Sequence, residues 1–316
     1  RERQEQQEHL SNVLYVNFHG KKIVEESAEL AATGIDGDEA KIRMFVASKK
    51  AVNRKTETLK QYTKEICNML TFLGKRLEDI TGMDLRYYYG VMREKRGIKM
   101  STMQTRLHYL SSFWDFLNSE ELIRSNPVKK VGALKLEKTM KKPFAAEELE
   151  ALREGCKELR DRALVEFLYS TGVRVSELAA LNVADIEMGK QELIVYGKGS
   201  KERKTYLTDS AKFHLRRYLQ ERDAKPDEPL FVTLDAPHDR LSVAGIQYML
   251  RQLGRRAGVT GVHPHRFRRT IATDLLNRGM PIEQVKEFLG HEKLDTTMIY
   301  CAVRAESVKA SHRKYA

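Results

Sequence analysis

The sequence has few cysteines, no long apolar run and no signal peptide. Its three cysteines, Cys67, Cys156 and Cys301, are odd in number and include no CxxC pair, which argues against a secreted disulfide framework and a cysteine-based metal site. The longest apolar runs fall far below the roughly 20 residues that span a bilayer. The N-terminal RERQEQQEHL lacks the apolar region that directs secretion. We therefore expect a cytoplasmic protein with no membrane partner.

Two common motifs for metals and nucleotides are also missing. His291-Glu292 does not extend to HExxH, because position 295 is Asp, and no acidic cluster has metal-ligand spacing. Gly197-Lys198-Gly199 lacks the GxxxxGK[ST] pattern of a P-loop and joins two expected strands instead of opening a helix. We expect no metal site and no cofactor.

Positive charge is in excess and unevenly distributed. The chain has 56 Lys and Arg against 44 Asp and Glu, with a net charge of +12 and a pI near 9.4. Residues 1–40 carry 4 basic and 9 acidic side chains, residues 41–142 carry 23 and 10, and residues 143–316 carry 29 and 25. This pattern favours a polyanionic partner, with nucleic acid as the leading candidate and the middle segment as its footprint. A well-solvated basic protein is the alternative that charge alone leaves open.

The first half of the chain divides into an appendage, a helical domain and a linker. Residues 1–40 are an acidic appendage of uncertain role. Residues 41–128 show helical periodicity, including a helix that stops at Gly74 and a capping box over residues 81–84. We expect Ser101 to cap a further helix with an apolar stripe in the core. Residues 129–143 carry all six lysines of the stretch VKKVGALKLEKTMKKP and form a basic linker without periodicity.

The second domain, residues 144–316, is again mainly helical. Helical patterns cover 209–221, 242–257, 265–278, 281–289 and 294–303. The exception is a pair of β-rich runs, Glu192 to Tyr196 and Arg203 to Leu207, joined by a glycine-containing turn, which predicts a hairpin.

Basic side chains in both domains are candidates for phosphate contacts. Arg54, Lys55 and Arg106 belong to the first domain, and Lys201 and Arg203 belong to the hairpin. Cations of this kind supply most contacts to the DNA backbone. A plain solvated charge is the alternative for each of them.

A second set of cations has the chemistry for phosphodiester transfer. His265 and Arg268 lie at i and i+3 on a helix expected to begin at Pro264, so both project from one face. Arg174, Lys198, His291 and Tyr300 supply further cations, an acid and a nucleophile. Glu177, three residues after Arg174, is placed to pair with it. Singly these signals are weak, because a lone Arg is usually a surface ion pair and a lone Tyr usually core.

The order and spacing of these residues resemble the tyrosine recombinase (phage integrase) family, especially its Xer-like members. Four segments carry the resemblance in family order: TGVRVSEL, GKGSKER, HPHRFRRT and LGHEKLDTTMIY, across residues 171–300. With weaker likeness in the helical part, the resemblance covers about residues 41–316. It implies a mainly α fold with a small antiparallel β-sheet, arranged as a C-shaped DNA clamp of a helical (SAM-like) core-binding domain and a catalytic domain.

The resemblance also implies a role for each catalytic candidate. Arg174 and Arg268 would hold the scissile phosphate, and Tyr300 would attack it to form a 3′-phosphotyrosyl bond. Lys198 would protonate the leaving 5′-oxygen. His265 would assist proton transfer at the tyrosine, and His291 would hydrogen-bond the phosphate. Because the bond energy is conserved, neither ATP nor metal is required.

One position departs from the family pattern. Arg269 stands where the family commonly has a second histidine. The substitution raises local positive charge and replaces none of the six implied catalytic roles.

The implied function is site-specific DNA recombination through a Holliday junction, for integration or excision of a mobile element or for dimer resolution. The implied partners are double-stranded DNA with specific recombination sites, three further copies in a homo-tetramer, and accessory DNA-bending or directionality factors, with residues 301–316 as a docking segment. Such a protein would be associated with the nucleoid. Two alternatives stay open: relaxation of DNA by a type IB topoisomerase-like enzyme, and a non-catalytic DNA-binding regulator.

Overall fold

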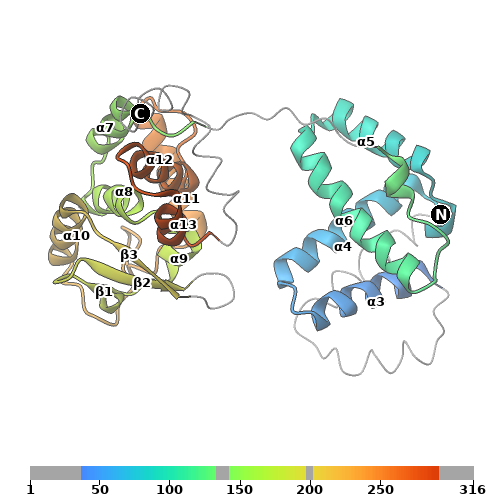
Figure 1. Ribbon diagram of the computed structural model, residues 1–316, viewed down its shortest axis with the longest axis horizontal. Helices are drawn as coiled ribbons and strands as arrows, with labels where there is room; N and C mark the ends of the chain where they lie inside the picture. The colour runs from blue at the N-terminus through green and yellow to red at the C-terminus, as the bar shows by residue number, and fades with distance from the viewer. Residues whose placement is uncertain (1–36, 133–141, 197–201, 292–316) are drawn as a thin grey trace, which may run out of the picture. The chain divides into compact units, whose positions relative to one another are not determined.

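The computed structural model describes residues 37–132, 142–196 and 202–291. The chain divides into two compact units, Arg1–Thr139 and Met140–Ala316, each with its own hydrophobic core (Figure 1). Among the described residues both units are mainly helical, and the second also contains a small antiparallel sheet, which confirms the predicted fold class. No helix in the described ranges is both long and apolar enough to span a membrane.

The first unit is a bundle of helices. The predicted stop at Gly74 is confirmed, since this residue has a φ of +58°, in the left-handed region that glycine accepts. The predicted capping box is also confirmed: the Thr81 N–H donates to Asp84 (2.9 Å) and the Thr81 hydroxyl accepts from the Asp84 N–H (3.3 Å). The long helices over residues 37–132 are α3 (Asp38–Ala51), α4 (Thr56–Leu73), α5 (Gly82–Arg96) and α6 (Met100–Ser119), with short 3-10 turns at Leu77–Asp79 and Pro127–Lys130.

The aromatic residues of α6 form part of the core of this unit, as predicted. Phe113 and Trp114 are buried, and the Phe113 ring lies 5.2 Å from that of Phe45 in an edge-on contact. Such contacts add to the free energy gained by burying the rings.

The start of α6 differs from the prediction. The helix begins at Met100 with Lys99 as its N-cap, and Ser101 lies inside the first turn. Gly97 caps α5 in the left-handed conformation, and only three residues separate the two helices. The short connection starts α6 before Ser101 can act as a cap.

The second unit packs helices around a small sheet. Its strands, β1 (Ile186–Glu187), β2 (Glu192–Tyr196) and β3 (Glu202–Tyr206), are antiparallel in the order β1-β2-β3. The predicted hairpin is confirmed, but β3 begins and ends one residue earlier than the periodicity predicts. The two-residue strand β1 carries no periodic signal. The helices described here are α7 (Ala146–Glu154), α8 (Leu159–Thr171), α9 (Val175–Ala180), α10 (Asp209–Glu221), α11 (Val243–Arg256), α12 (Pro264–Asn277) and α13 (Ile282–Leu289).

Helix α8 is the centre of this unit. Most of its side chains are buried, and it packs against α10 and α12. It ends at Gly172, whose φ is +57° and where a Cβ atom would lie 3.1 Å from the side chains of Ile271 and Leu289. This close packing allows the chain to turn at once into α9, whose N-cap is Arg174.

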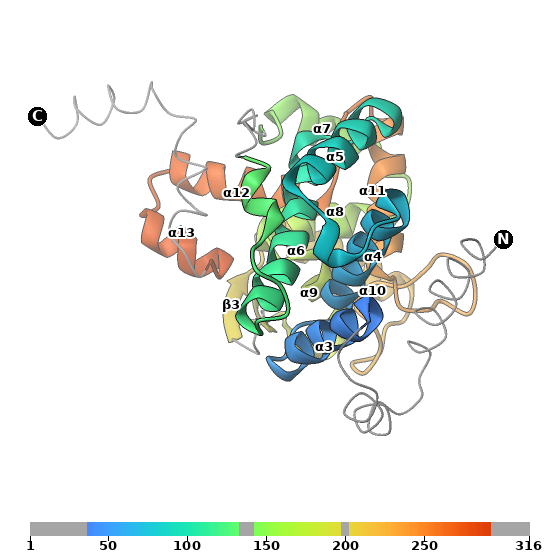
Figure 2. The same ribbon diagram turned by 90° about the vertical axis from the view of Figure 1, so that its right-hand side faces the viewer.

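Helix α13 packs against both α12 and β3 (Figure 2). The fold therefore brings together four places distant in sequence: the start of α9, strand β3, the first turns of α12 and the end of α13. The helix predicted at 294–303 lies outside the described residues.

Candidate active site

Arg174 is fixed at the start of α9 by Glu177. Its backbone N–H and its guanidinium both donate to the Glu177 carboxylate, each at 2.8 Å. The predicted ion pair is therefore confirmed. The Arg174 side chain stays 34% exposed, so part of its guanidinium faces solvent.

Arg268 is a buried arginine on α12. The helix begins at Pro264, as predicted. Arg268 is 4% exposed, and its two terminal nitrogens donate to the carbonyl groups of Gly172 and Leu289. His265 lies in the first turn of the same helix and is exposed. The guanidinium of Arg268 thus joins the end of α8 to the end of α13.

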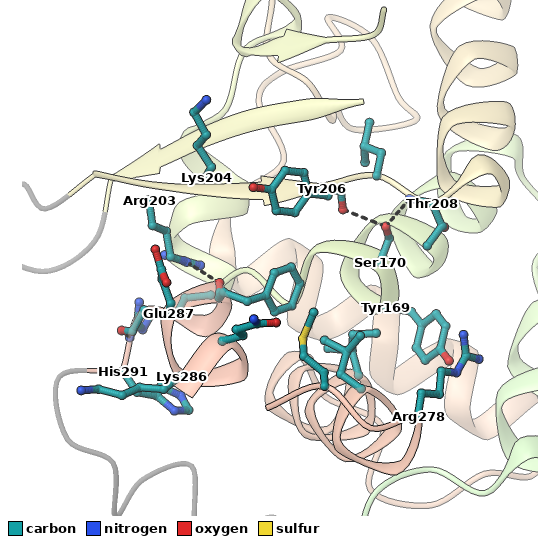
Figure 3. A pocket seen from close by; sticks show the side chains of 18 of the residues that line it. Tyr169, Ser170, Arg203, Lys204, Tyr206, Thr208, Arg278, Lys286, Glu287 and His291 are labelled. Carbon is teal, nitrogen blue, oxygen red and sulfur yellow. Dashed lines mark hydrogen bonds between the residues drawn. The ribbon is translucent and has the colours of Figure 1, made fainter. Parts of the chain in front are cut away.

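Arg203 is turned inward by the register of the sheet. It pairs with Val195, a buried residue of β2, and its side chain is 9% exposed. Its terminal nitrogens donate to both Glu177 oxygens (2.9 and 2.7 Å), and its Nε donates to the Phe288 carbonyl (3.2 Å; Figure 3). Arg203 thus points to the inner side of the sheet, and the DNA contact predicted for it stays a prediction.

Three backbone carbonyl groups at the end of α13 accept hydrogen bonds from three arginines. The carbonyls of residues 288–290 accept, in that order, from Arg203, Arg268 and Arg174. A helix C-terminus leaves such carbonyls without intrahelical partners and carries partial negative charge. Since each arginine comes from a different element, this helix end is the point where β3, α12 and α9 converge.

His291 follows directly on this cluster. Its backbone N–H donates to the Lys286 carbonyl (3.1 Å), which continues the last turn of α13. Burial, followed by the charges of Arg268, Arg174 and Arg203, lowers the pKa of His291 to about 4. The imidazole is therefore neutral at pH 7, when it can donate one hydrogen bond and accept another.

The electrostatic balance of the cluster is positive. Burial acts to raise the pKa of Glu177, but hydrogen bonds from Arg203 and Arg174 outweigh it and lower the pKa to about 2. Glu177 is thus ionised at neutral pH. The guanidinium groups of Arg174, Arg203 and Arg268, counted against the single Glu177 carboxylate, give the cluster a net charge of +2 while His291 is neutral.

A cavity of about 1360 Å³ opens beside these residues in the second unit (Figure 3). Arg203 and His291 lie on one side of it, while Tyr169 and Arg278 lie farther along, by α8 and α12. Arg174 also lines this cavity. Arg174 and His291 are thereby accessible to an anionic ligand. Within the described ranges, no group of three or more His, Cys, Asp or Glu is arranged to hold a metal ion.

Several of the predicted catalytic and DNA-contact residues lie away from this cluster or outside the described residues. Lys198, Lys201 and Tyr300 lie outside the described residues. Arg54 and Lys55 are exposed just before α4.

Arg106, also predicted to contact DNA, lies on α6 in the first unit. Its Nε is 3.5 Å from the carboxylate of Glu65, and its side chain is 29% exposed. The side chain therefore bridges a buried acid and the surface.

The sequence analysis did not predict that Arg203 belongs to this cluster. Its contact with Glu177 joins residues 26 positions apart, beyond the reach of helical spacing. The available signal was the alternation of the hairpin: Arg203 and Thr205 face the buried Val195 and Leu193, so both belong to the inner face.

Comparison with known proteins shows the family of this chain. The phage integrase family model matches residues 141–307. The tyrosine recombinase XerC of Leptospira interrogans serogroup Icterohaemorrhagiae serovar copenhageni is 33% identical over 273 residues, covering 83% of this chain and 88% of the relative. The XerC protein of Listeria monocytogenes serotype 4b is 34% identical over 280 residues, covering 83% and 92%. The chain therefore belongs to the phage integrase family of tyrosine site-specific recombinases.

Solved structures share the fold. The Tn1549 transposon integrase in complex with transposon right end DNA superposes with a TM-score of 0.70 at 18% sequence identity, covering 87% of this chain and 98% of that one. At this identity the likeness shows the fold alone.

Proposed function

We propose that the protein cuts and rejoins double-stranded DNA at specific sites through a 3′-phosphotyrosyl intermediate. The observation that carries the proposal is the convergence of Arg174, Arg268 and His291 on the end of α13, beside an accessible cavity. Cleavage places a second negative charge on the phosphate oxygens in the transition state. A preorganised cluster of net charge +2 stabilises that charge without reorganising.

In this proposal the arginines bind and polarise the scissile phosphate. The exposed part of Arg174 binds one non-bridging oxygen, and Arg268 orients the other from beneath. Neutral His291 donates a hydrogen bond to the phosphate, and His265 assists proton transfer at the nucleophile. Tyr300 attacks the phosphorus, and Lys198 gives its proton to the 5′-oxygen that leaves.

The same chemistry run in reverse reseals the strand. An incoming 5′-hydroxyl displaces Tyr300, so the phosphotyrosyl bond supplies the energy of religation and no ATP is consumed. Exchange between two duplexes passes through a Holliday junction. We propose that four copies carry it out on two sites, with residues 41–128 binding the core DNA, 129–143 linking the domains, 144–316 performing catalysis and 301–316 docking on a neighbouring copy.

The biological role follows from the sites that are joined. Sites at the ends of a mobile element indicate integration or excision, and paired sites on replicated chromosomes indicate dimer resolution. The relatives named tyrosine recombinase XerC support the recombinase activity that both roles share. Accessory DNA-bending or directionality factors would select the direction.

Covalent capture tests the proposal. The full chain is incubated in EDTA with nicked duplexes from its genomic neighbourhood, and DNA that stays attached after denaturation is sequenced. We expect 3′-linked adducts at a few related sequences. Tyr300→Phe should form none while binding DNA within about twofold of the wild type, and Tyr87→Phe, at an exposed tyrosine of the first unit, should behave as wild type.

Each other outcome of this capture has a distinct meaning. Adducts scattered over unrelated sequences favour the topoisomerase-like activity. Strong binding without adducts favours the regulator. Adducts that persist in Tyr300→Phe exclude Tyr300 as the nucleophile.

The acid role of Lys198 has its own test. Lys198→Ala should slow cleavage of an ordinary duplex far more than cleavage of one with a 5′-thiol leaving group, because a thiolate leaves without protonation. Equal slowing on both substrates removes Lys198 from the acid role.

A further inference from the structure

We propose that Arg203 is a positioning residue of the recombination reaction, holding Glu177 and the last turn of α13 so that Arg174 and His291 keep their orientation toward the phosphate. The inference rests on the proposed function, since it concerns the same site. It assigns to Arg203 a role distinct from DNA contact and distinct from direct catalysis.

The contacts of Arg203 are directed entirely at the neighbours of the proposed catalytic groups. Its side chain is 9% exposed, against 34% for Arg174. All three of its guanidinium nitrogens have protein acceptors: two bind Glu177 and one binds the Phe288 carbonyl. Although Arg203 lines the cavity, these contacts place it to act on the phosphate through its neighbours.

Glu177 transmits the position of Arg203 to Arg174. Its Oε1 accepts from the guanidinium groups of both arginines, at 2.8 and 2.9 Å. Its Oε2 accepts from the Arg174 backbone N–H and from Arg203, at 2.8 and 2.7 Å. Without Arg203, half of these donors are lost, and the carboxylate is free to rotate toward Arg174 and change its orientation.

The backbone at Gly290 transmits the position of Arg203 to His291. Gly290 has a φ of +64°, and a Cβ atom there would lie 2.7 Å from Cδ of Arg203. The aliphatic stem of Arg203 therefore packs directly on the residue that precedes His291. Its Nε holds the Phe288 carbonyl on the same turn.

Arg203 also contributes charge to the surroundings of His291. The groups around this imidazole are Arg174 on α9 with Glu177, Arg203 on β3, Arg268 on α12, and Lys286 and Glu287 on α13. Removing the Arg203 charge should raise the pKa of His291, whereas Arg203→Lys should keep it closer to the wild-type value. This Coulombic effect requires the Arg203 charge to lie close to the imidazole, as it does in the structure.

The first experiment measures the order of the His291 pKa values in these variants and does not require recombination. The imidazole proton of His291 is titrated by NMR in the full-length wild type, Arg203→Met and Arg203→Lys, with His291→Gln to assign the signal. We expect the pKa to rise most in Arg203→Met and less in Arg203→Lys. Arg222→Lys is the matched control, because Arg222 also binds a carboxylate and backbone carbonyls, at the C-cap of α10 and outside the cavity. An unchanged titration in Arg203→Met overturns the proposal.

The second experiment measures single-turnover cleavage at saturating DNA. We expect Arg203→Met to lower the cleavage rate at least tenfold and Arg203→Lys to restore part of it, with DNA affinity within about twofold of the wild type. Wild-type rates in folded Arg203→Met overturn the proposal, as does a loss of affinity larger than the loss of rate. If the wild type itself forms no adduct, the proposed function fails, and the NMR titration alone decides the role of Arg203.

Discussion

Two buried glutamates, one in each unit, have opposite electrostatic behaviour. Glu65 is 4% exposed and accepts from the hydroxyl groups of Tyr89 (2.9 Å) and Tyr88 (3.4 Å), with Arg106 Nε at 3.5 Å. Burial raises the pKa of Glu65 more than these contacts lower it. Glu177 is 7% exposed, yet its pKa is lowered to about 2, because the hydrogen bonds it accepts outweigh its burial.

The difference lies in the charge of the donors. Neutral hydroxyl groups stabilise a carboxylate less than guanidinium groups do, and three of the four hydrogen bonds to Glu177 come from guanidinium groups. Burial alone therefore does not set the ionisation of a carboxylate. The first unit uses its acid to fill a polar position in a packed core, whereas the second uses its acid to hold cations in a defined arrangement.

The largest expected effect comes from removing the acid of the second unit. Glu177→Ala leaves Arg203 buried without its counter-charge, and we expect a loss of about 3–5 kcal/mol in the free energy of unfolding. Urea denaturation measures it. Glu192→Ala, which removes only a half-exposed partner 3.5 Å from Lys204, should change stability by less than about 1 kcal/mol. A loss below about 1 kcal/mol for Glu177→Ala would contradict the comparison.

A smaller effect is expected from crowding the arginines that hold the end of α13. Gly290→Ala should cost about 1–3 kcal/mol, because φ is positive and the new methyl group meets Arg203 at 2.7 Å. Cleavage should fall with it. Gly258→Ala is the matched control: its φ is +68° but nothing lies within 4 Å of the added Cβ, so it should lose stability without losing cleavage. Equal cleavage by the two variants would show that the approach of Arg203 to Gly290 is unimportant.

Acid should destabilise the second unit through His291. A histidine whose pKa is lowered on folding binds a proton more readily when unfolded, so stability falls as pH decreases from about 6.5 toward the folded value of about 4. Because the ring is half-buried, we expect a change of about 1 kcal/mol after solvent screening. Urea denaturation at several pH values should show a shallower acid slope for His291→Gln, and an unchanged slope would contradict the assignment.

The smallest effect is expected in the first unit. The raised pKa of Glu65 means that its charge opposes folding at pH 7, so Glu65→Gln should be neutral or stabilising by up to about 1 kcal/mol. Any gain should disappear as pH falls below about 4.5, where the unfolded carboxylate is also protonated. The fluorescence of Trp114, the single tryptophan and a buried residue of this unit, follows the transition. If Glu65→Gln instead lowered the free energy of unfolding by more than about 3 kcal/mol, the charge of Glu65 would stabilise the fold as that of Glu177 does.

Local contacts in the site were predictable from the sequence, and distant ones were not. Arg174 and Glu177 stand three residues apart, so their pairing follows from helix geometry. Arg268 on a helix that begins at Pro264 follows equally from local rules. The direction in which Arg268 points depends on Gly172 and Leu289, which only the folded chain brings near.

The secondary structure shows the same division. The helix end at Gly74 agrees with the prediction because the left-handed conformation of a glycine is a local property. Strand β3 was displaced by one residue, since its pairing with β2 decides where it starts. The two-residue strand β1 exists only because β2 lies beside it.

The three arginines at the end of α13 also make the geometry of the site depend on distant parts of the chain. The contact between Arg174 and Gly290 joins residues 116 positions apart, and such long-range contacts form late because ordering the intervening chain costs entropy. Before the end of α13 docks, Arg174 and Arg203 can bind Glu177, and Arg268 can bind Gly172. The docking of one helix end therefore completes the alignment of all three guanidinium groups at once.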